Sequence, residues 1–160
     1  SAHGLAQRLG IARGESAEII DEYFRQYPKI KILMELTIKK AREQGYVETL
    51  LGRRRPLRDI NSANGTVRAG AERVAVNTPI QGTAADMIKI AMHKVQDLLE
   101  KEETKTRMLL QIHDELVFDL HKDEQDSLPT KIAECMQNAL PLSVPIVVDL
   151  GTGANWLEAH

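Results

Sequence analysis

The sequence predicts an α+β fold in which helices come first and a small antiparallel sheet follows. Apolar residues recur at helical spacing through most of residues 1–44 and 67–101. Two apolar runs of strand length, residues 108–112 and 116–120, are separated by only three polar residues, which indicates a β-hairpin. Helices packed on one face of such a hairpin would complete a core.

Three helices are expected at the start of the chain. Ser1 can cap the first, and Gly10 ends it. The second covers about residues 15–27 and stops at Pro28, because proline interrupts a helix. The third covers about residues 29–44 and closes at a glycine.

Residues 5–11 and the helix that follows also fit a helix-turn-helix module that reads DNA. A recognition helix needs basic or amide side chains that face phosphates and bases. The second helix instead carries four acids, Glu15, Glu18, Asp21 and Glu22. Because these acids would repel DNA, a DNA-binding module without enzymatic activity stays the less favoured alternative.

A basic connecting segment over residues 45–66 follows the helices. A short strand is expected over residues 46–52, which end at a glycine turn. From Arg53 to Arg73 the chain carries six arginines and two acids, although its overall formal net charge is -2. Since guanidinium groups bind phosphate oxygens, this segment, with Arg53 and Arg54 first, predicts a surface that contacts the DNA backbone. The alternative is a solvated loop.

The longest helical pattern covers about residues 67–101. Arg73, Asn77 and Gln81 recur every four residues, so they share one helix face. Long donors suit the DNA minor groove, where every base pair shows acceptors at similar places. A polar face that meets only water is the alternative. Pro79 and Gly82 should bend this helix.

Three polar residues, His113, Asp114 and Glu115, separate the two predicted strands, and the two acids are the candidates for catalysis and metal binding. Two adjacent carboxylates repel each other unless a cation lies beside them. Mg²⁺ suits such a pair, because it takes a few carboxylate oxygens and keeps the rest of its shell for water and phosphate. The tripeptide taken alone favours the alternative, a solvated turn between two strands, because short motifs often match by chance.

The last part of the chain predicts one more helix and one more strand. The helix should begin at Ser127 or Leu128 and end before Pro141, and Cys135 should lie on its apolar face. Residues 145–150 are apolar and predict a buried strand. A single cysteine excludes an internal disulfide and is compatible with the cytoplasm, and no apolar run reaches membrane-spanning length.

Several stretches of the chain, in this order, resemble the family A DNA polymerases, of the bacterial DNA polymerase I type. They are residues 1–6, 45–54, 72–86, 107–120 and 151–157. The resemblance implies that residues 1–44 are a remnant of the helical fingers and residues 45–66 a connecting segment. Residues 67–160 would be a partial palm domain.

The resemblance also implies a function, which is template-directed transfer of a nucleotidyl group from a dNTP to a primer 3′-hydroxyl. Asp114 would be a ligand of a two-ion Mg²⁺ site, Glu115 an auxiliary carboxylate and His113 a neighbour of the primer end. The three donors of the long helix would lie near the primer terminus. The implied partners are a DNA primer-template and dNTP.

Parts that the resemblance requires are absent from these 160 residues. They include the family's other metal-binding aspartate, in an Asp-Tyr-Ser-Gln-Ile-Glu type motif, and the helix that holds the triphosphate. We therefore expect a piece of a longer protein that does not polymerise by itself. In the family, the strand with that aspartate lies between the strands at 116–120 and 145–150. These two should then pair directly or recruit a second copy into a homodimer.

Overall fold

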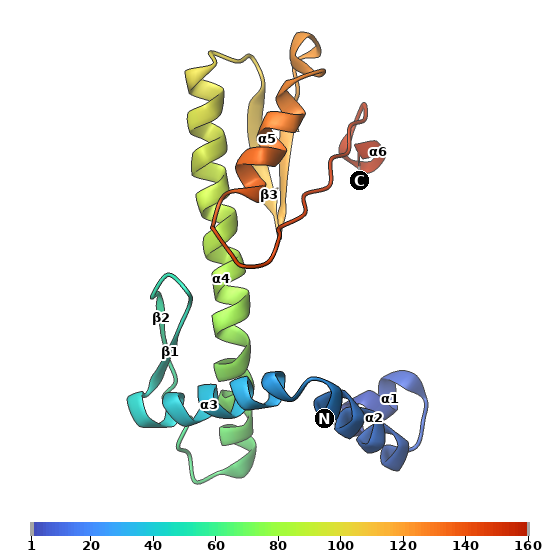
Figure 1. Cartoon of the computed structure of the whole chain (residues 1–160), viewed down its shortest axis with the longest axis vertical. Helices are drawn as coiled ribbons and strands as arrows, with labels where there is room; N and C mark the ends of the chain where they lie inside the picture. Colours follow the sequence, from blue (N-terminus) through green and yellow to red (C-terminus); the bar gives the residue numbers. More distant parts are fainter. Residues whose placement is uncertain (1, 160) are drawn as a thin grey trace. The chain divides into compact units, whose positions relative to one another are not determined.

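The computed structural model describes residues 2–159 and confirms the α+β fold (Figure 1). The chain divides into two compact units. The first holds the residues up to Glu48 together with Arg54–Pro79, and the second holds Thr49–Arg53 together with the residues from Ile80 onward.

The three predicted N-terminal helices are α1 (Ala2–Leu9), α2 (Arg13–Gln26) and α3 (Pro28–Gln44). Proline occupies the first turn of α3, where its missing N–H removes no helical hydrogen bond. Gly45 closes α3 in the left-handed conformation, with φ 79°, and its N–H donates to the carbonyl oxygen of Ala41 at 2.8 Å. The cap predicted at Ser1 lies outside the described residues.

The predicted strand at 46–52 is shorter than expected, because it is one arm of a hairpin. Strand β1 (Tyr46–Glu48) pairs antiparallel with β2 (Arg54–Pro56), a strand that the sequence analysis missed. The guanidinium of Arg54 lies over the Tyr46 ring, 4.6 Å from its centroid, and its Nε donates to Glu48 Oε1 at 2.8 Å. These cross-strand contacts favour the pairing despite the low strand propensity of Arg-Arg-Pro.

The core of the first unit joins α3, β1, the segment after β2 and the first part of α4 (Gly65–Lys101). Its buried members are Ala41, Val47, Leu57, Ile60 and Ala75. Asn64 caps α4, since its Oδ1 accepts from the N–H groups of Thr66 and Val67 at 3.0 and 3.3 Å. Helix α4 continues through Pro79, and the bend predicted there stays a prediction.

In the second unit, α5 (Leu128–Gln137) and the later part of α4 pack against one face of the hairpin of β3 (Arg107–Ile112) and β4 (Glu115–Asp119) (Figure 1). This arrangement confirms the predicted hairpin and its covered face. The core residues are Val95, Leu99, Leu128 and Ile132, against which Met108, Phe118 and Cys135 pack. Leu109 and Leu110 are exposed, beside a bulge in β3.

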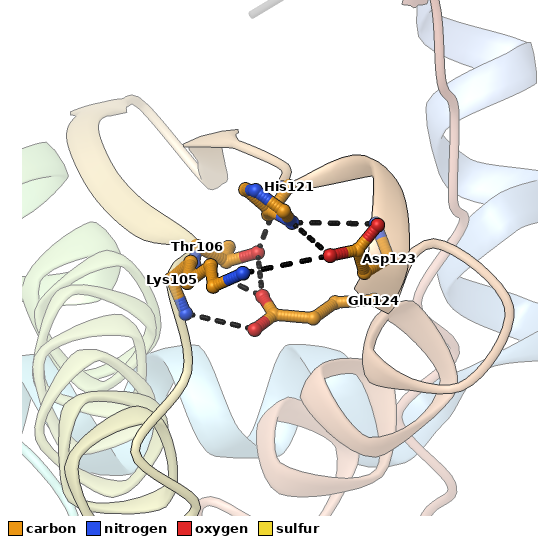
Figure 2. Close-up of polar contacts among 5 residues, drawn as sticks. All are labelled: Lys105, Thr106, His121, Asp123 and Glu124. Atoms are coloured by element: carbon orange, nitrogen blue, oxygen red, sulfur yellow. Dashed lines mark hydrogen bonds and ion pairs between the residues drawn. The ribbon is translucent and has the colours of Figure 1, made fainter.

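A polar cluster closes the open end of this hairpin by joining the residues before β3 to η1 (Lys122–Glu124) (Figure 2). Thr106 Oγ1 donates to Glu124 Oε2 at 2.5 Å and accepts from the His121 N–H at 3.0 Å. The Glu124 carboxylate also accepts from the N–H groups of Lys105 and Thr106, at 2.8 and 3.0 Å. These bonds, that of the Thr106 hydroxyl first, hold the pKa of Glu124 below its ordinary value of 4.5.

The predicted buried strand at residues 145–150 is wrong. This segment forms no strand in the described structure, and Val147 is 77% exposed. A strand needs a partner to take its N–H and C=O groups, and among residues 2–159 the sheet of β3 and β4 consists of those two strands. The helix before it ends at Gln137, earlier than Pro141 suggested, and Ser127 takes the cap position without a side-chain hydrogen bond.

The C-terminal tail ends in a short helix, α6 (Trp156–Ala159), in which Trp156 is half exposed. Two glycines allow the tail to fold back on this helix. A Cβ at Gly151 would collide with the backbone of Ala159, and one at Gly153 would lie 2.6 Å from the Glu158 Cβ. None of the helices formed by residues 2–159 is long and apolar enough to span a membrane.

Candidate catalytic and nucleic-acid-binding site

The predicted catalytic residues lie at the tight turn between β3 and β4. Ile112 pairs with Glu115, so His113 and Asp114 are the two central residues of the turn. His113 has φ 53°, in the left-handed region that the first position of a tight hairpin turn requires. The Gln111 side chain donates its Nε2–H to the His113 carbonyl oxygen at 2.7 Å and so holds the turn from β3.

The two carboxylates of this turn differ in their surroundings. Asp114 is exposed at the tip, whereas Glu115 is half-buried and is the first residue of β4. The carboxylate of Asp114 is therefore open to a ligand from solvent. Across residues 2–159, no three His, Cys, Asp or Glu side chains come together to hold a metal. The turn offers hard oxygen ligands that fit one side of a divalent cation site, and the remaining ligands would come from elsewhere.

Arg73 and Asn77 lie together in the first unit, on one exposed face of α4. They line an open groove of about 790 Å³ between α4 and the segment that contains β2. The groove is also lined by Arg55, Arg58 and Asp59, and by the apolar side chains of Leu57, Val67, Ala71 and Val74. The groove therefore combines basic donors with apolar side chains.

Gln81 is exposed on α4 in the second unit. The turn of the β1–β2 hairpin, residues 49–53, makes polar contacts with the part of α4 that follows Gln81. Arg53 Nη2 donates to the Gly82 carbonyl oxygen at 3.0 Å and pairs with Asp86 Oδ1 at 2.7 Å. The Leu50 N–H donates to Thr83 Oγ1 at 3.0 Å. These contacts fix residues 49–53 on the helix that carries Gln81.

The guanidinium groups predicted to contact the DNA backbone are thus held by carboxylates. Arg53 pairs with the buried Asp86, whose second oxygen, Oδ2, has no hydrogen-bond partner in the described structure. Arg54 pairs with Glu48, and this hydrogen bond raises the pKa of Arg54. An arginine has five N–H donors, so such a pair occupies only part of its donor set.

The structure adds one residue that the sequence did not single out, Gln111, and it places two arginines of the predicted DNA-contacting segment, Arg55 and Arg58, beside the candidates. Gln111 stabilises the turn, and Arg55 and Arg58 line the groove with Arg73. A Gln two residues before a predicted turn is a usable signal, because its amide reaches the turn carbonyls. The positions of Arg55 and Arg58 depend on the pairing of β2, which the sequence does not reveal.

Three comparisons relate this chain to known proteins. A family model of DNA polymerase family A matches residues 1–158. DNA polymerase I of Bacillus caldotenax is 48% identical over 159 residues, which are 99% of this chain and 18% of the relative. DNA polymerase I of Pseudomonas aeruginosa is 47% identical over 160 residues, with 100% and 18% covered. The thermostable DNA polymerase I of Thermus filiformis is 46% identical over 159 residues, with 99% and 19% covered.

A solved structure agrees with these relatives. It is the POL domain of Pol1 from M. smegmatis in complex with DNA primer-template and dNTP, with a TM-score of 0.95 and 43% identity. The match covers 99% of this chain and 28% of that one, and the chain spans about a fifth of the length of the curated relatives. DNA polymerase families in general use a divalent metal cofactor. Of the two interpretations that the sequence left open, the comparisons confirm the polymerase over the helix-turn-helix module: the chain belongs to DNA polymerase family A.

Proposed function

We propose that this chain is the part of a DNA polymerase that supplies one metal-binding carboxylate and a set of primer-template contacts for template-directed DNA synthesis in replication and repair. The observation that carries the proposal is the TM-score of 0.95 with a polymerase domain whose complex holds DNA primer-template and dNTP. Because the relatives are bacterial, the proposed location is the cytoplasm.

Asp114 is the proposed metal ligand, because its carboxylate is exposed at the tip of a turn that both strands hold in place. Glu115 is the proposed auxiliary carboxylate. Mg²⁺ is the proposed ion, since it takes few protein oxygens and keeps positions for water and phosphate. When bound, two such ions stabilise the attacking and leaving oxygens of a nucleotidyl transfer.

The proposed DNA contacts are hydrogen bonds from side-chain donors that do not distinguish one base from another. Arg73, Asn77 and Gln81 would donate to minor-groove acceptors, and His113 would lie beside the primer end. Arg53 and Arg54 would reach the phosphate backbone with the N–H groups that their ion pairs leave over. Donors of this kind accept any base sequence, as a template-directed enzyme must.

The test uses the full-length polymerase to which we propose this segment belongs, with Asp114→Ala and the matched control Asp119→Ala. Both aspartates are exposed and belong to the same hairpin, but Asp119 ends β4 at the far end from the turn. Asp114→Ala should lower kcat for primer extension by orders of magnitude and leave DNA affinity nearly unchanged. Near-normal turnover of Asp114→Ala, or an equal loss in Asp119→Ala, would refute the assignment.

We also propose that the 160-residue chain does not extend a primer alone, because it holds one of the two metal-binding motifs and no helix for the triphosphate. Template-dependent extension by the purified chain with Mg²⁺ would contradict this. Self-association into a homodimer is the second part of this proposal, since exposed Leu109 and Leu110 lie on a two-stranded sheet with open edges. Light scattering over a concentration series tests it, and a constant monomer mass would reject it.

A further inference from the structure

Three polar side chains are buried where the turn of the β1–β2 hairpin meets α4. Thr49, Thr83 and Asp86 are 7%, 7% and 9% exposed. Thr49 belongs to the turn and the other two to α4, and all three lie in the second unit. Since a buried polar group costs free energy unless it is hydrogen-bonded, each of these side chains should have a defined partner.

The two threonines accept from backbone N–H groups of the turn. The Leu50 N–H donates to Thr83 Oγ1 at 3.0 Å, and this bond joins the turn to α4. The Arg53 N–H donates to Thr49 Oγ1 at 3.2 Å, and the Thr49 N–H donates to the Arg53 carbonyl oxygen at 3.0 Å. The backbone of Arg53 is thereby fixed within the turn.

The Arg53 side chain makes the second link between the turn and α4. Its Nη2 donates to the Gly82 carbonyl oxygen at 3.0 Å and lies 2.7 Å from Asp86 Oδ1. Gly82 and Asp86 are four residues apart, so both contacts lie on one face of the helix. Because a single nitrogen makes both contacts, neither of them needs the N–H groups of Nε and Nη1. Asp86 thus fixes the direction of the guanidinium and leaves its other edge for a further acceptor.

Stability alone does not account for a carboxylate at this place. The Arg53 side chain is 50% exposed, and an ion pair with one partner in water stabilises a fold only weakly. The other carboxylate oxygen, Asp86 Oδ2, is buried without a hydrogen-bond partner in the described structure, which costs free energy. The role of Asp86 is therefore better explained by the group that it orients.

We propose that Asp86 is a positioning residue for primer-template binding, because it orients the Arg53 guanidinium and holds the hairpin turn against the part of α4 that carries Gln81. The inference rests on the proposed function, in which Arg53 and Gln81 contact DNA. It adds a residue that acts through Arg53 and does not itself touch DNA. Gln81 directly precedes Gly82, where Arg53 contacts the helix. A loosened turn would let both DNA contacts move, and a displacement of about 1 Å is enough to weaken an aligned contact.

The test uses the full-length polymerase with Asp86→Asn, which keeps the shape of the side chain and removes its charge. The dissociation constant for a primer-template duplex, measured by fluorescence anisotropy, should rise by about tenfold, as for the loss of one hydrogen bond to a charged group. The kcat for primer extension at saturating DNA should stay within about twofold, because binding of the ground state and of the transition state weakens alike. Removal of a negative charge alone would act in the opposite direction and favour DNA binding.

Asp97→Asn is the matched control, because Asp97 is an exposed aspartate of the same helix. It should leave the dissociation constant unchanged or lower it. Thr83→Val loosens the same turn without a change of charge, so it should also raise the dissociation constant, and it replaces Asp86→Asn in the test if that variant does not fold. In an Arg53→Gln background, Asp86→Asn should have no further effect, because it acts through the guanidinium.

Unchanged or tighter DNA binding by Asp86→Asn, or by Thr83→Val where it takes its place, would overturn the proposal. So would an equal loss of affinity from Asp86→Asn with and without the Arg53 guanidinium, because a merely structural role of the aspartate predicts that result. None of these outcomes changes the extension assay on Asp114→Ala. Failure of the positioning role and failure of the proposed function are therefore separate results.

Discussion

Replacing Thr106 with valine should weaken the second unit through the cluster that closes the β3–β4 hairpin (Figure 2). Valine keeps the shape of threonine but removes the hydroxyl, which donates to Glu124 at 2.5 Å and accepts from the His121 N–H at 3.0 Å. Thr106 is 3% exposed, so water does not readily replace these partners. Two ordinary hydrogen bonds at about 1 kcal/mol each predict that Thr106→Val lowers the free energy of unfolding by about 2 kcal/mol.

The pH dependence of this effect follows from Glu124. Its folded-state pKa is lowered, mainly by the Thr106 hydroxyl, so the charged carboxylate stabilises the fold above its ordinary pKa of 4.5. That contribution is lost as the pH falls through the folded-state pKa, because both the folded and the unfolded chain then hold the proton. The difference between Thr106→Val and the original chain should therefore shrink in acid.

Urea unfolding followed by circular dichroism, at neutral pH and well below pH 4.5, measures both effects. Thr106→Ser is the matched control, because it keeps the hydroxyl and loses one methyl group, at a cost of about 0.8 kcal/mol that does not depend on pH. If Thr106→Val were as stable as Thr106→Ser at neutral pH, or if its deficit stayed constant in acid, the assigned role of the cluster would be wrong.

Two further predictions concern the cores and the helix ends. Leu128→Ala should cost about 2–5 kcal/mol in urea unfolding, since Leu128 is 2% exposed in the core of the second unit, whereas the exposed Leu157 should tolerate alanine. Gly45→Ala should destabilise the end of α3 by about 1 kcal/mol because φ is 79° there, although a Cβ would meet no atom within 4 Å. Gly14→Ala, equally unobstructed and inside α2, should be neutral or stabilising, and an equal loss at both glycines would contradict this reasoning.

The helices could be predicted because their determinants are local. Apolar spacing and the breaks at Pro28 and Gly45 mark α2 and α3 almost to the residue, since a helix makes its backbone hydrogen bonds within its own segment. The predicted start at Ser127 or Leu128 likewise agrees with α5, which begins at Leu128 and has a proline in its first turn. The strand β2 could not be predicted, because Arg-Arg-Pro has low strand propensity and its pairing depends on contacts across the hairpin, such as those of Arg54 with Tyr46 and Glu48.

The candidate site divides in the same way. His113, Asp114 and Glu115 are neighbours in sequence, so the sequence alone brought them to one turn. Arg73 and Asn77 were found from their helical spacing. The groove that they share with Arg55 and Arg58 could not be predicted from the sequence, because it depends on where the β2 segment lies against α4.

The failed strand at 145–150 shows why pattern alone does not make a sheet. Ile146, Val147 and Val148 have high strand propensity, yet propensity in a strand expresses contacts with a neighbour more than a preference of the backbone. Helices α4 and α5 cover one face of the β3–β4 hairpin. Within the described structure no strand pairs with residues 145–150, which stay irregular with Val147 exposed. A strand that completes this sheet would have to satisfy the open edge of the hairpin first, and only then would the apolar residues of 145–150 gain a partner to pair with.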